Sequence, residues 1–149
     1  MASIRDGVWP TMITPFTEEG RLDVHALEAQ VAWYLDRHVD GLFAVCQSSE
    51  MFFLSLQERV ALAQAVVDQV GGQVEVIASG HISGTLEAQV EEVQRVADTG
   101  VDAVVLVTNR FAQEDEGDDV WVANLERFLD RVPDTIALGF YECPYPCLL

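Results

Sequence analysis

Short apolar runs alternate along the chain with longer amphipathic segments. The apolar runs occupy residues 8–14, 41–46, 74–79, 102–108 and 135–141. Continuous apolar runs of this length are typical of strands that are buried on both faces. Their alternation with amphipathic segments predicts βα units arranged around a parallel sheet.

Four amphipathic segments between these runs are predicted to be helices. Asp23 is the expected N-cap of the first helix, and Ser55 and Glu58 form the S-x-x-E capping box of the second. The third helix is predicted to begin near Thr85. The residues predicted to face the core are Leu27, Val31, Tyr34 and Leu35, then Val60, Ala63, Val67 and Val70, then Leu86, Val90, Val93 and Ala97, and finally Val122, Leu125 and Leu129.

Two α/β architectures fit five strands and four helices in a single domain over residues 1–149. One is an open, doubly wound parallel sheet, which is complete at this size. The other is an incomplete (β/α)8 TIM barrel with strands 1 to 5 and helices 1 to 4, because a full barrel needs about 250 residues. An open nucleotide-binding sheet carries a glycine-rich phosphate loop after its first strand. Residues 14–20 read TPFTEEG, which is not such a loop, because a proline stands where the tight turn would be. The helix periodicity does not separate the two architectures.

Composition excludes several kinds of partner. The chain has 25 acidic and 8 basic residues, a net charge of −17, which repels nucleic acid and anionic membrane surfaces. No stretch approaches the roughly 18 apolar residues of a membrane span, and no signal peptide is evident, so we predict a cytoplasmic protein. Cys46, Cys143 and Cys147 match neither a disulfide framework nor a zinc site. We expect no metal and no cofactor.

Several short motifs follow one another in a specific order and spacing. They are Thr14-Pro15-Phe16, Gly20-x-Leu22-Asp23, Asp40-Gly41, Glu50 with Leu54 and Glu58-Arg59, Gly100-x-Asp102-Ala103, and Tyr141-x-x-Pro144. In these motifs the sequence resembles the dihydrodipicolinate synthase and N-acetylneuraminate lyase family of pyruvate-dependent aldolases. The resemblance extends from about Gly7 to Pro144. It implies a TIM barrel, usually tetrameric, that binds pyruvate or another 2-oxo acid as a Schiff base on a lysine of strand 6.

The resemblance conflicts with the composition in one respect. All eight basic residues are arginines, so the chain contains no lysine. A Schiff base needs an amine nucleophile, which the permanently protonated guanidinium does not provide. We therefore expect a truncated lyase that lacks its catalytic lysine and is inactive alone.

The resemblance also implies roles for four residues, and a departure from the family pattern adds a fifth candidate. Tyr141 matches the tyrosine that relays protons as a general acid and base. Gln47, Ser48 and Ser49 stand where the family binds the pyruvate carboxylate with T-T-G, although Gln47 lacks the hydroxyl of a proton relay. Arg110 stands where the family commonly has T-P-Y-Y, and it is either a candidate substrate contact or an exposed loop arginine.

Two other features are weaker candidates for function. His81 ends the third predicted strand, but a lone loop histidine is more often solvated or hydrogen-bonded. The acidic run 114–119 lacks the spacing of a calcium loop and is typical of a solvated helix N-terminus. By contrast, Phe111 is evidence against one function. Family members that make dihydrodipicolinate supply a phenol from this position to a neighbouring subunit's site, and phenylalanine has no phenol, so the residue counts against a role in lysine biosynthesis.

The sequence also predicts which partners the protein has. Half a barrel leaves two sheet edges open, which favours self-association or a homo-oligomer, and the expected small-molecule partner is a 2-oxo acid. The alternative function is that of a non-catalytic scaffold or small-carboxylate-binding α/β protein, complete as it stands. The strand order distinguishes the two, because an open sheet places its first strand in the middle.

Overall fold

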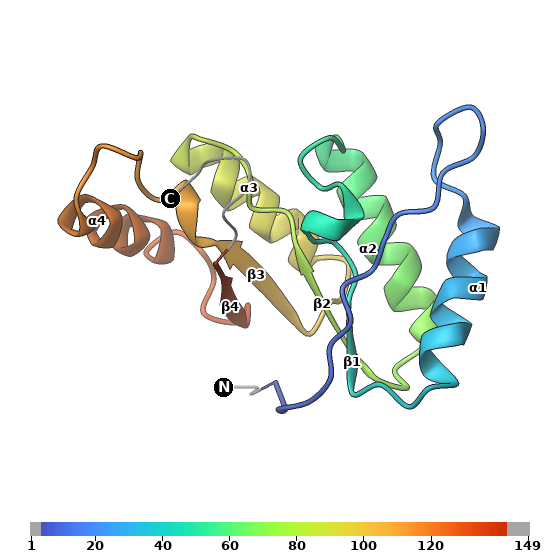
Figure 1. Ribbon diagram of the computed structural model, residues 1–149. Helices are drawn as coiled ribbons and strands as arrows, with labels where there is room; N and C mark the ends of the chain where they lie inside the picture. Colours follow the sequence, from blue (N-terminus) through green and yellow to red (C-terminus); the bar gives the residue numbers. More distant parts are fainter. Residues whose placement is uncertain (1–3, 143–149) are drawn as a thin grey trace.

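The computed structural model describes residues 4–142, which form a curved parallel sheet with helices along one side (Figure 1). The strands are β1 (Gly41–Phe43), β2 (Glu75–Ser79), β3 (Ala103–Val107) and β4 (Leu138–Tyr141). The helices are α1 (Val24–Leu35), α2 (Leu56–Val70), α3 (Leu86–Ala97) and α4 (Asp118–Leu129), and two 3-10 turns are η1 (Gln47–Ser49) and η2 (Thr108–Arg110). The strand order is β1-β2-β3-β4, with all pairs parallel. This sequential order confirms the incomplete barrel and not the open sheet.

The curvature of the sheet is visible in a contact between its first and last strands. The rings of Phe43 in β1 and Tyr141 in β4 meet edge to face, with centroids 6.0 Å apart. In a flat sheet, three strand spacings would separate these strands by about 14 Å. The contact therefore lies on a concave face, opposite the helices, as in the wall of a barrel.

The first apolar run, residues 8–14, is not a regular strand, and this part of the prediction is wrong. The run follows β1 in parallel, since the Met12 N–H donates to Phe43 O (3.0 Å) and the Phe43 N–H donates to Pro10 O (3.1 Å). The pairing amounts to one bridge, between Thr11 and Phe43. Pro10 has no N–H to donate, which limits a ladder at this edge.

The predicted helix starts are confirmed. The Asp23 carboxylate accepts the Ala26 N–H at 2.9 Å. The capping box is complete, because Ser55 Oγ accepts the Glu58 N–H while Glu58 Oε2 accepts the Ser55 N–H at 2.7 Å. Gly71 ends α2 with a φ of 57°, a conformation that glycine adopts without strain.

The inward faces of three helices differ from the prediction. In α2 the buried residues are Arg59, Leu62, Ala63, Val66 and Val70, while Val60 and Val67 are only partly buried. In α3 the buried residues are Gln89, Glu92, Val93 and Val96, while Leu86, Val90 and Ala97 are only partly buried. In α4 the prediction fails for Val122 and Leu129, which are 46% and 43% exposed, and Phe128 is the buried residue. Among the described elements α4 is the end of the helix layer, so only one flank packs against a neighbouring helix.

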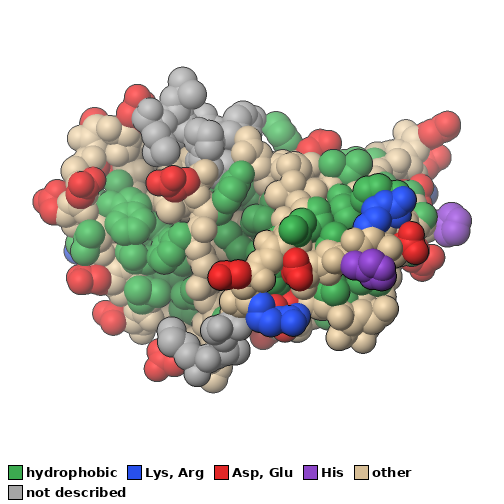
Figure 2. All heavy atoms as spheres, turned by 60° about the horizontal axis from the view of Figure 1, so that its bottom comes forward, with side chains coloured by type: hydrophobic (Ala, Val, Ile, Leu, Met, Phe, Trp, Pro, Cys, Tyr) green, Lys and Arg blue, Asp and Glu red, His purple; other side chains and the backbone are tan. Residues whose placement is uncertain are grey.

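The concave face is apolar and open. Figure 2 shows hydrophobic side chains gathered over the end of the molecule that carries α4 and β4. A hollow of about 1190 Å³ lies there, and its lining includes Phe43, Ile77, Val105, Leu129, Leu138 and Tyr141. None of the helices within residues 4–142 has the length and hydrophobicity needed to cross a bilayer.

Candidate substrate-binding site

The predicted site residues lie at one edge of the sheet. Parallel strands end at the same edge, and in TIM barrels the loops at this carboxyl edge carry the active site. Here the edge consists of η1 after β1, the loop 80–84 after β2, η2 after β3, and Tyr141 at the end of β4. We call these four segments the rim.

Ser49 is fully buried, and its hydroxyl is engaged by the backbone. Ser49 Oγ lies 2.7 Å from Met12 O and 2.9 Å from Ala44 O, and it accepts the Cys46 N–H at 3.1 Å. Thr14 Oγ1 donates to Ser49 O at 2.7 Å. The side chain of Ser49 therefore ties η1 to β1 and to the first apolar run.

Ser48 and Gln47 occupy the accessible side of the same turn. Ser48 is exposed, and its Oγ donates to Thr11 Oγ1 over a long 3.4 Å. Gln47 is partly exposed. Glu50 closes the turn with a φ of 61°, an uncommon conformation for a residue other than glycine. The turn thus presents the Ser48 hydroxyl to solvent on a firmly held backbone.

Tyr141 lies on the concave side of the rim. Its ring is partly buried and packs against the small cluster of Phe43, Cys46 and Val105. Cys46 Sγ is in turn 3.3 Å from Ser49 Oγ. Packing therefore connects the end of β4 with η1, although these segments are far apart in sequence.

Arg110 reaches from η2 toward the segment that follows η1. Its Cζ lies 5.3 Å from the ring centroid of Phe52, within the range of a cation–π interaction. Its backbone carbonyl accepts the Gln89 side-chain N–H at 3.0 Å. All five predicted residues thus belong to the rim, and Ser49 is the one whose side chain is fully buried.

His81 belongs to the loop 80–84 of the rim, and its side chain is fully buried. Its Nδ1 accepts the Val107 N–H at 3.2 Å, and its ring packs against Phe111 with centroids 4.8 Å apart. Burial lowers the pKa of His81 to about 4, although Gln89 and the charge of Glu92 act in the opposite direction. The imidazole is therefore neutral near pH 7 and holds the ends of β2 and β3 together.

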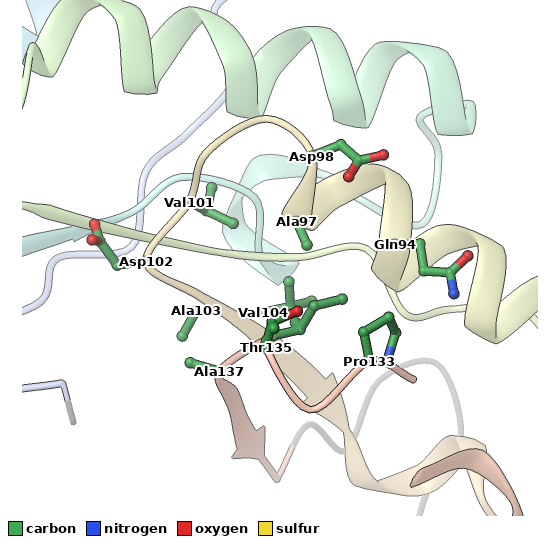
Figure 3. Close-up of a pocket in the computed structure, with 11 residues that line it drawn as sticks. Gln94, Ala97, Asp98, Val101, Asp102, Ala103, Val104, Pro133, Thr135 and Ala137 are labelled. Atoms are coloured by element: carbon green, nitrogen blue, oxygen red, sulfur yellow. The ribbon is translucent and has the colours of Figure 1, made fainter. Parts of the chain in front are cut away.

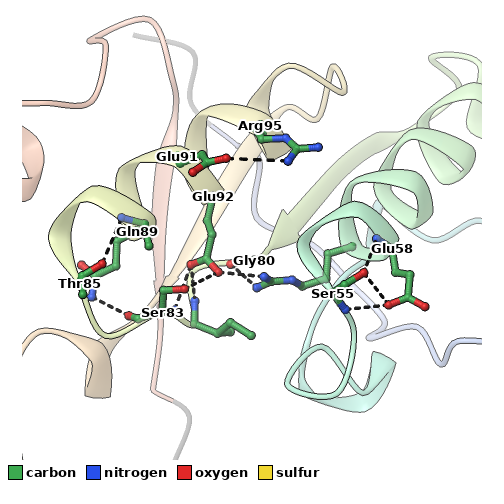
Figure 4. Close-up of polar contacts among 12 residues, drawn as sticks. Ser55, Glu58, Gly80, Ser83, Thr85, Gln89, Glu91, Glu92 and Arg95 are labelled. Atoms are coloured by element: carbon green, nitrogen blue, oxygen red, sulfur yellow. Dashed lines mark hydrogen bonds and ion pairs between the residues drawn. The ribbon is translucent and has the colours of Figure 1, made fainter.

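A buried ion pair supports the rim, and the sequence did not reveal it (Figure 4). Arg59 Nη2 donates to Glu92 Oε1 at 2.8 Å, and Arg59 Nη1 donates to Gly80 O at 2.6 Å. Glu92 also accepts the backbone N–H groups of Ile82 and Ser83, both at 3.0 Å. A charged residue in register with the apolar stripe of α2 is the signal that could have indicated this pair.

A second hollow lies at the opposite, amino edge of the sheet (Figure 3). Its volume is about 410 Å³, and Gln94, Asp98, Asp102, Pro133 and Thr135 contribute to its lining. Asp102 Oδ2 already accepts the Val76 N–H at 2.7 Å. The amino edge of such barrels serves stability, so the rim remains the candidate site. Within residues 4–142 no three His, Cys, Asp or Glu residues are grouped to hold a metal ion.

The curved sheet and its rim define a part of a TIM-barrel protein, and comparisons identify the family. The model of the dihydrodipicolinate synthetase family matches residues 5–117, so the chain belongs to that family. The 4-hydroxy-tetrahydrodipicolinate synthase of Saccharophagus degradans is 41% identical over 111 residues, which are 72% of this chain and 38% of that enzyme. The enzyme of the same name from Methanococcus vannielii is 36% identical over 143 residues, which are 93% of this chain and 46% of that enzyme.

Solved structures show the same relationship. A crystallised dihydrodipicolinate synthase is 28% identical, with a TM-score of 0.80 over 93% of this chain and 46% of its own. A prophage protein of the family from E. coli K12, YagE, solved in complex with pyruvate, is 25% identical, with a TM-score of 0.82 over 95% of this chain and 46% of its own. The chain thus spans less than half the length of these relatives.

Proposed function

We propose that this chain forms the 2-oxo-acid-binding part of a carbon–carbon lyase. The observation that carries the proposal is the gathering of Gln47, Ser48, Arg110 and Tyr141 around one rim of a partial barrel. The pyruvate complex of the E. coli relative supports a 2-oxo acid as the ligand.

Three rim side chains, those of Ser48, Arg110 and Tyr141, have a chemical role in this proposal. Ser48 and the backbone of η1 donate hydrogen bonds to the carboxylate of the oxo acid, and Arg110 adds a positive charge. Ser49 contributes indirectly, because its hydroxyl holds the turn on which Gln47 and Ser48 stand. The phenol of Tyr141 transfers the proton when the carbon–carbon bond forms or breaks.

The amine for Schiff-base chemistry lies outside this sequence in our proposal. The 149 residues contain no lysine, and arginine does not form a Schiff base. The chain alone is then expected to bind a 2-oxo acid without turning it over.

Reductive trapping tests this expectation. We predict that pyruvate and borohydride leave no covalent adduct on any side chain of this protein, as measured by intact mass and peptide mapping. Peptide mapping separates a true side-chain adduct from reaction at the N-terminal amine, which any protein offers. A trapped side-chain adduct would contradict the proposal.

The partner that completes the site is also part of the proposal. The apolar concave face and the edge of β4 fit either a polypeptide carrying further βα units or a second copy of this chain. The absence of lysine also favours a second candidate function, a non-catalytic protein that binds small carboxylates. Mixing the chain with the lysine-bearing C-terminal half of a relative distinguishes the two candidate functions. The mixture should turn over substrate if this chain is part of a lyase, and it should not if the chain only binds carboxylates.

A further inference from the structure

Arg110 differs from most arginines of this chain in its partners. Six of the eight arginines lie within 3.9 Å of a carboxylate oxygen, namely Arg5, Arg21, Arg37, Arg59, Arg95 and Arg131. In the part of the chain that the structure describes, Arg110 forms no such ion pair. Its Nε is buried and meets no hydrogen-bond acceptor among the same residues. Among the described residues this guanidinium therefore has no carboxylate partner, although the chain carries a net charge of −17.

The backbone beneath Arg110 is held by side chains on both sides. Gln89 Nε2 donates to Arg110 O at 3.0 Å and to Ser83 O at 2.9 Å, which joins η2 to the loop after β2. Trp121 Nε1 donates to Thr108 O at 2.7 Å. Gln89 is only 4% exposed, so these bonds are shielded from water. Arg110 therefore starts from a fixed backbone position.

The side chain of Arg110 lies beside the ring of Phe52. The Phe52 ring lies 5.3 Å from Arg110 Cζ, and an aromatic face attracts a guanidinium without using its N–H donors. Phe52 follows η1 by three residues, so the charge is brought toward the turn that presents Ser48. An ion pair would instead occupy the donors and weaken anion binding.

We propose that Phe52 and Gln89 are positioning residues, which hold the Arg110 guanidinium at the rim to bind the carboxylate of the 2-oxo acid. This inference rests on the proposed function. It adds two residues that touch no substrate themselves and act through Arg110.

NMR of the arginine Nε–Hε groups tests the proposal on the whole chain during a titration with pyruvate. We expect Phe52→Leu to remove the ring-current shift of the Arg110 signal and to weaken pyruvate binding about two- to fivefold. Phe52→Tyr, which keeps the aromatic face, should restore both. Phe53→Leu is the matched control, because Phe53 is 74% exposed and adjacent in sequence, and it should change neither.

The outcomes separate the two proposals. If Phe52→Leu leaves the Arg110 signal or the pyruvate affinity unchanged, the positioning role is wrong while the proposed binding function stands. If pyruvate shifts no arginine signal of the unmodified chain, the carboxylate contact of Arg110 is overturned. If the unmodified chain shows no pyruvate binding at all, the proposed function and the inference built on it both fail.

Discussion

Ser48 and Ser49 are neighbours of the same residue type, but the fold uses them differently. The Ser49 hydroxyl is buried among backbone groups of Met12, Ala44 and Cys46, whereas the Ser48 hydroxyl faces solvent with one long contact. Sequence reasoning assigned both to the substrate, because it could not see which hydroxyl already had partners. The distinction depends partly on the neighbouring loop and partly on Thr11 and Met12, which are 37 residues away in the sequence.

Alanine substitution should separate the two serines. Ser49→Ala leaves buried backbone groups without their partner and should lower the free energy of unfolding by about 1–3 kcal/mol. Ser48→Ala, the matched control, should change stability by less than about 0.5 kcal/mol and weaken pyruvate binding instead. Urea unfolding and calorimetric titration measure the two effects. Equal destabilisation by both substitutions would contradict this assignment.

His81 should make stability depend on pH in a defined window. Its pKa is lowered to about 4 in the folded chain, compared with 6.5 for an unperturbed histidine. The unfolded chain therefore takes up a proton between these values while the folded chain does not, so stability falls as the pH drops from about 6.5 to about 4. The loss amounts to about 3 kcal/mol from this group.

Comparison with His81→Gln isolates this effect from the many carboxylates. We expect the variant to lose less stability than the unmodified chain over the same pH window, measured by urea unfolding at each pH. Parallel pH profiles would show that His81 is not the titrating group.

At the scale of elements, the polar residues of α2 and α3 organise the loops of the rim. Arg59 and Glu92 join the two helices and hold the loop after β2. Gln89 then joins that loop to η2. The helices therefore do more than cover the sheet, because their buried polar side chains set the geometry of the candidate site.

Glu92→Gln should disturb this support, and Glu91→Gln is its matched control. Removing the charge of Glu92 leaves Arg59 buried without a counter-ion, and breaking a buried pair costs about 3–5 kcal/mol. Glu91 is a solvent-exposed partner of Arg95, so its substitution should change stability by less than about 1 kcal/mol. Hydrogen exchange at the Ile82 and Ser83 amides should accelerate only in Glu92→Gln. Unchanged protection at both amides would contradict the role of Glu92.

At the scale of the whole molecule, apolar attraction and electrostatic repulsion between two copies of the chain compete. The open concave face and Phe140, which is 55% exposed in the last strand of the sheet, favour association. The net charge of −17 opposes contact between two copies. Salt screens this repulsion over about 10 Å at 0.1 M and leaves the apolar attraction in place.

Self-association should therefore increase with salt concentration. Analytical ultracentrifugation should detect larger species as salt is raised, and Phe140→Ser should reduce them. Phe53→Ser is the matched control, since Phe53 is also exposed but lies after η1 and not in the last strand of the sheet. This substitution should have little effect on association. A monomer that stays monodisperse at every salt concentration and unfolds cooperatively would contradict this prediction.

The sequence alone determined the features that depend on local periodicity and on residue type. It predicted four of the strands and the starts of α1 and α2, because caps and apolar runs act over a few residues. Its motifs also indicated the family, and its composition shows that the chain contains no lysine. It overestimated the first run as a strand, since Pro10 and the edge position limit pairing there.

Only the tertiary structure decided which equivalent-looking residues are buried, paired or free to bind. Val122 and Leu129 are exposed because α4 lies at the end of the helix layer, which a helical period does not encode. Ser49, Glu92 and His81 acquired their partners from segments distant in the chain. Burial and pairing are properties of the space between elements, so they appear only when the elements are packed together.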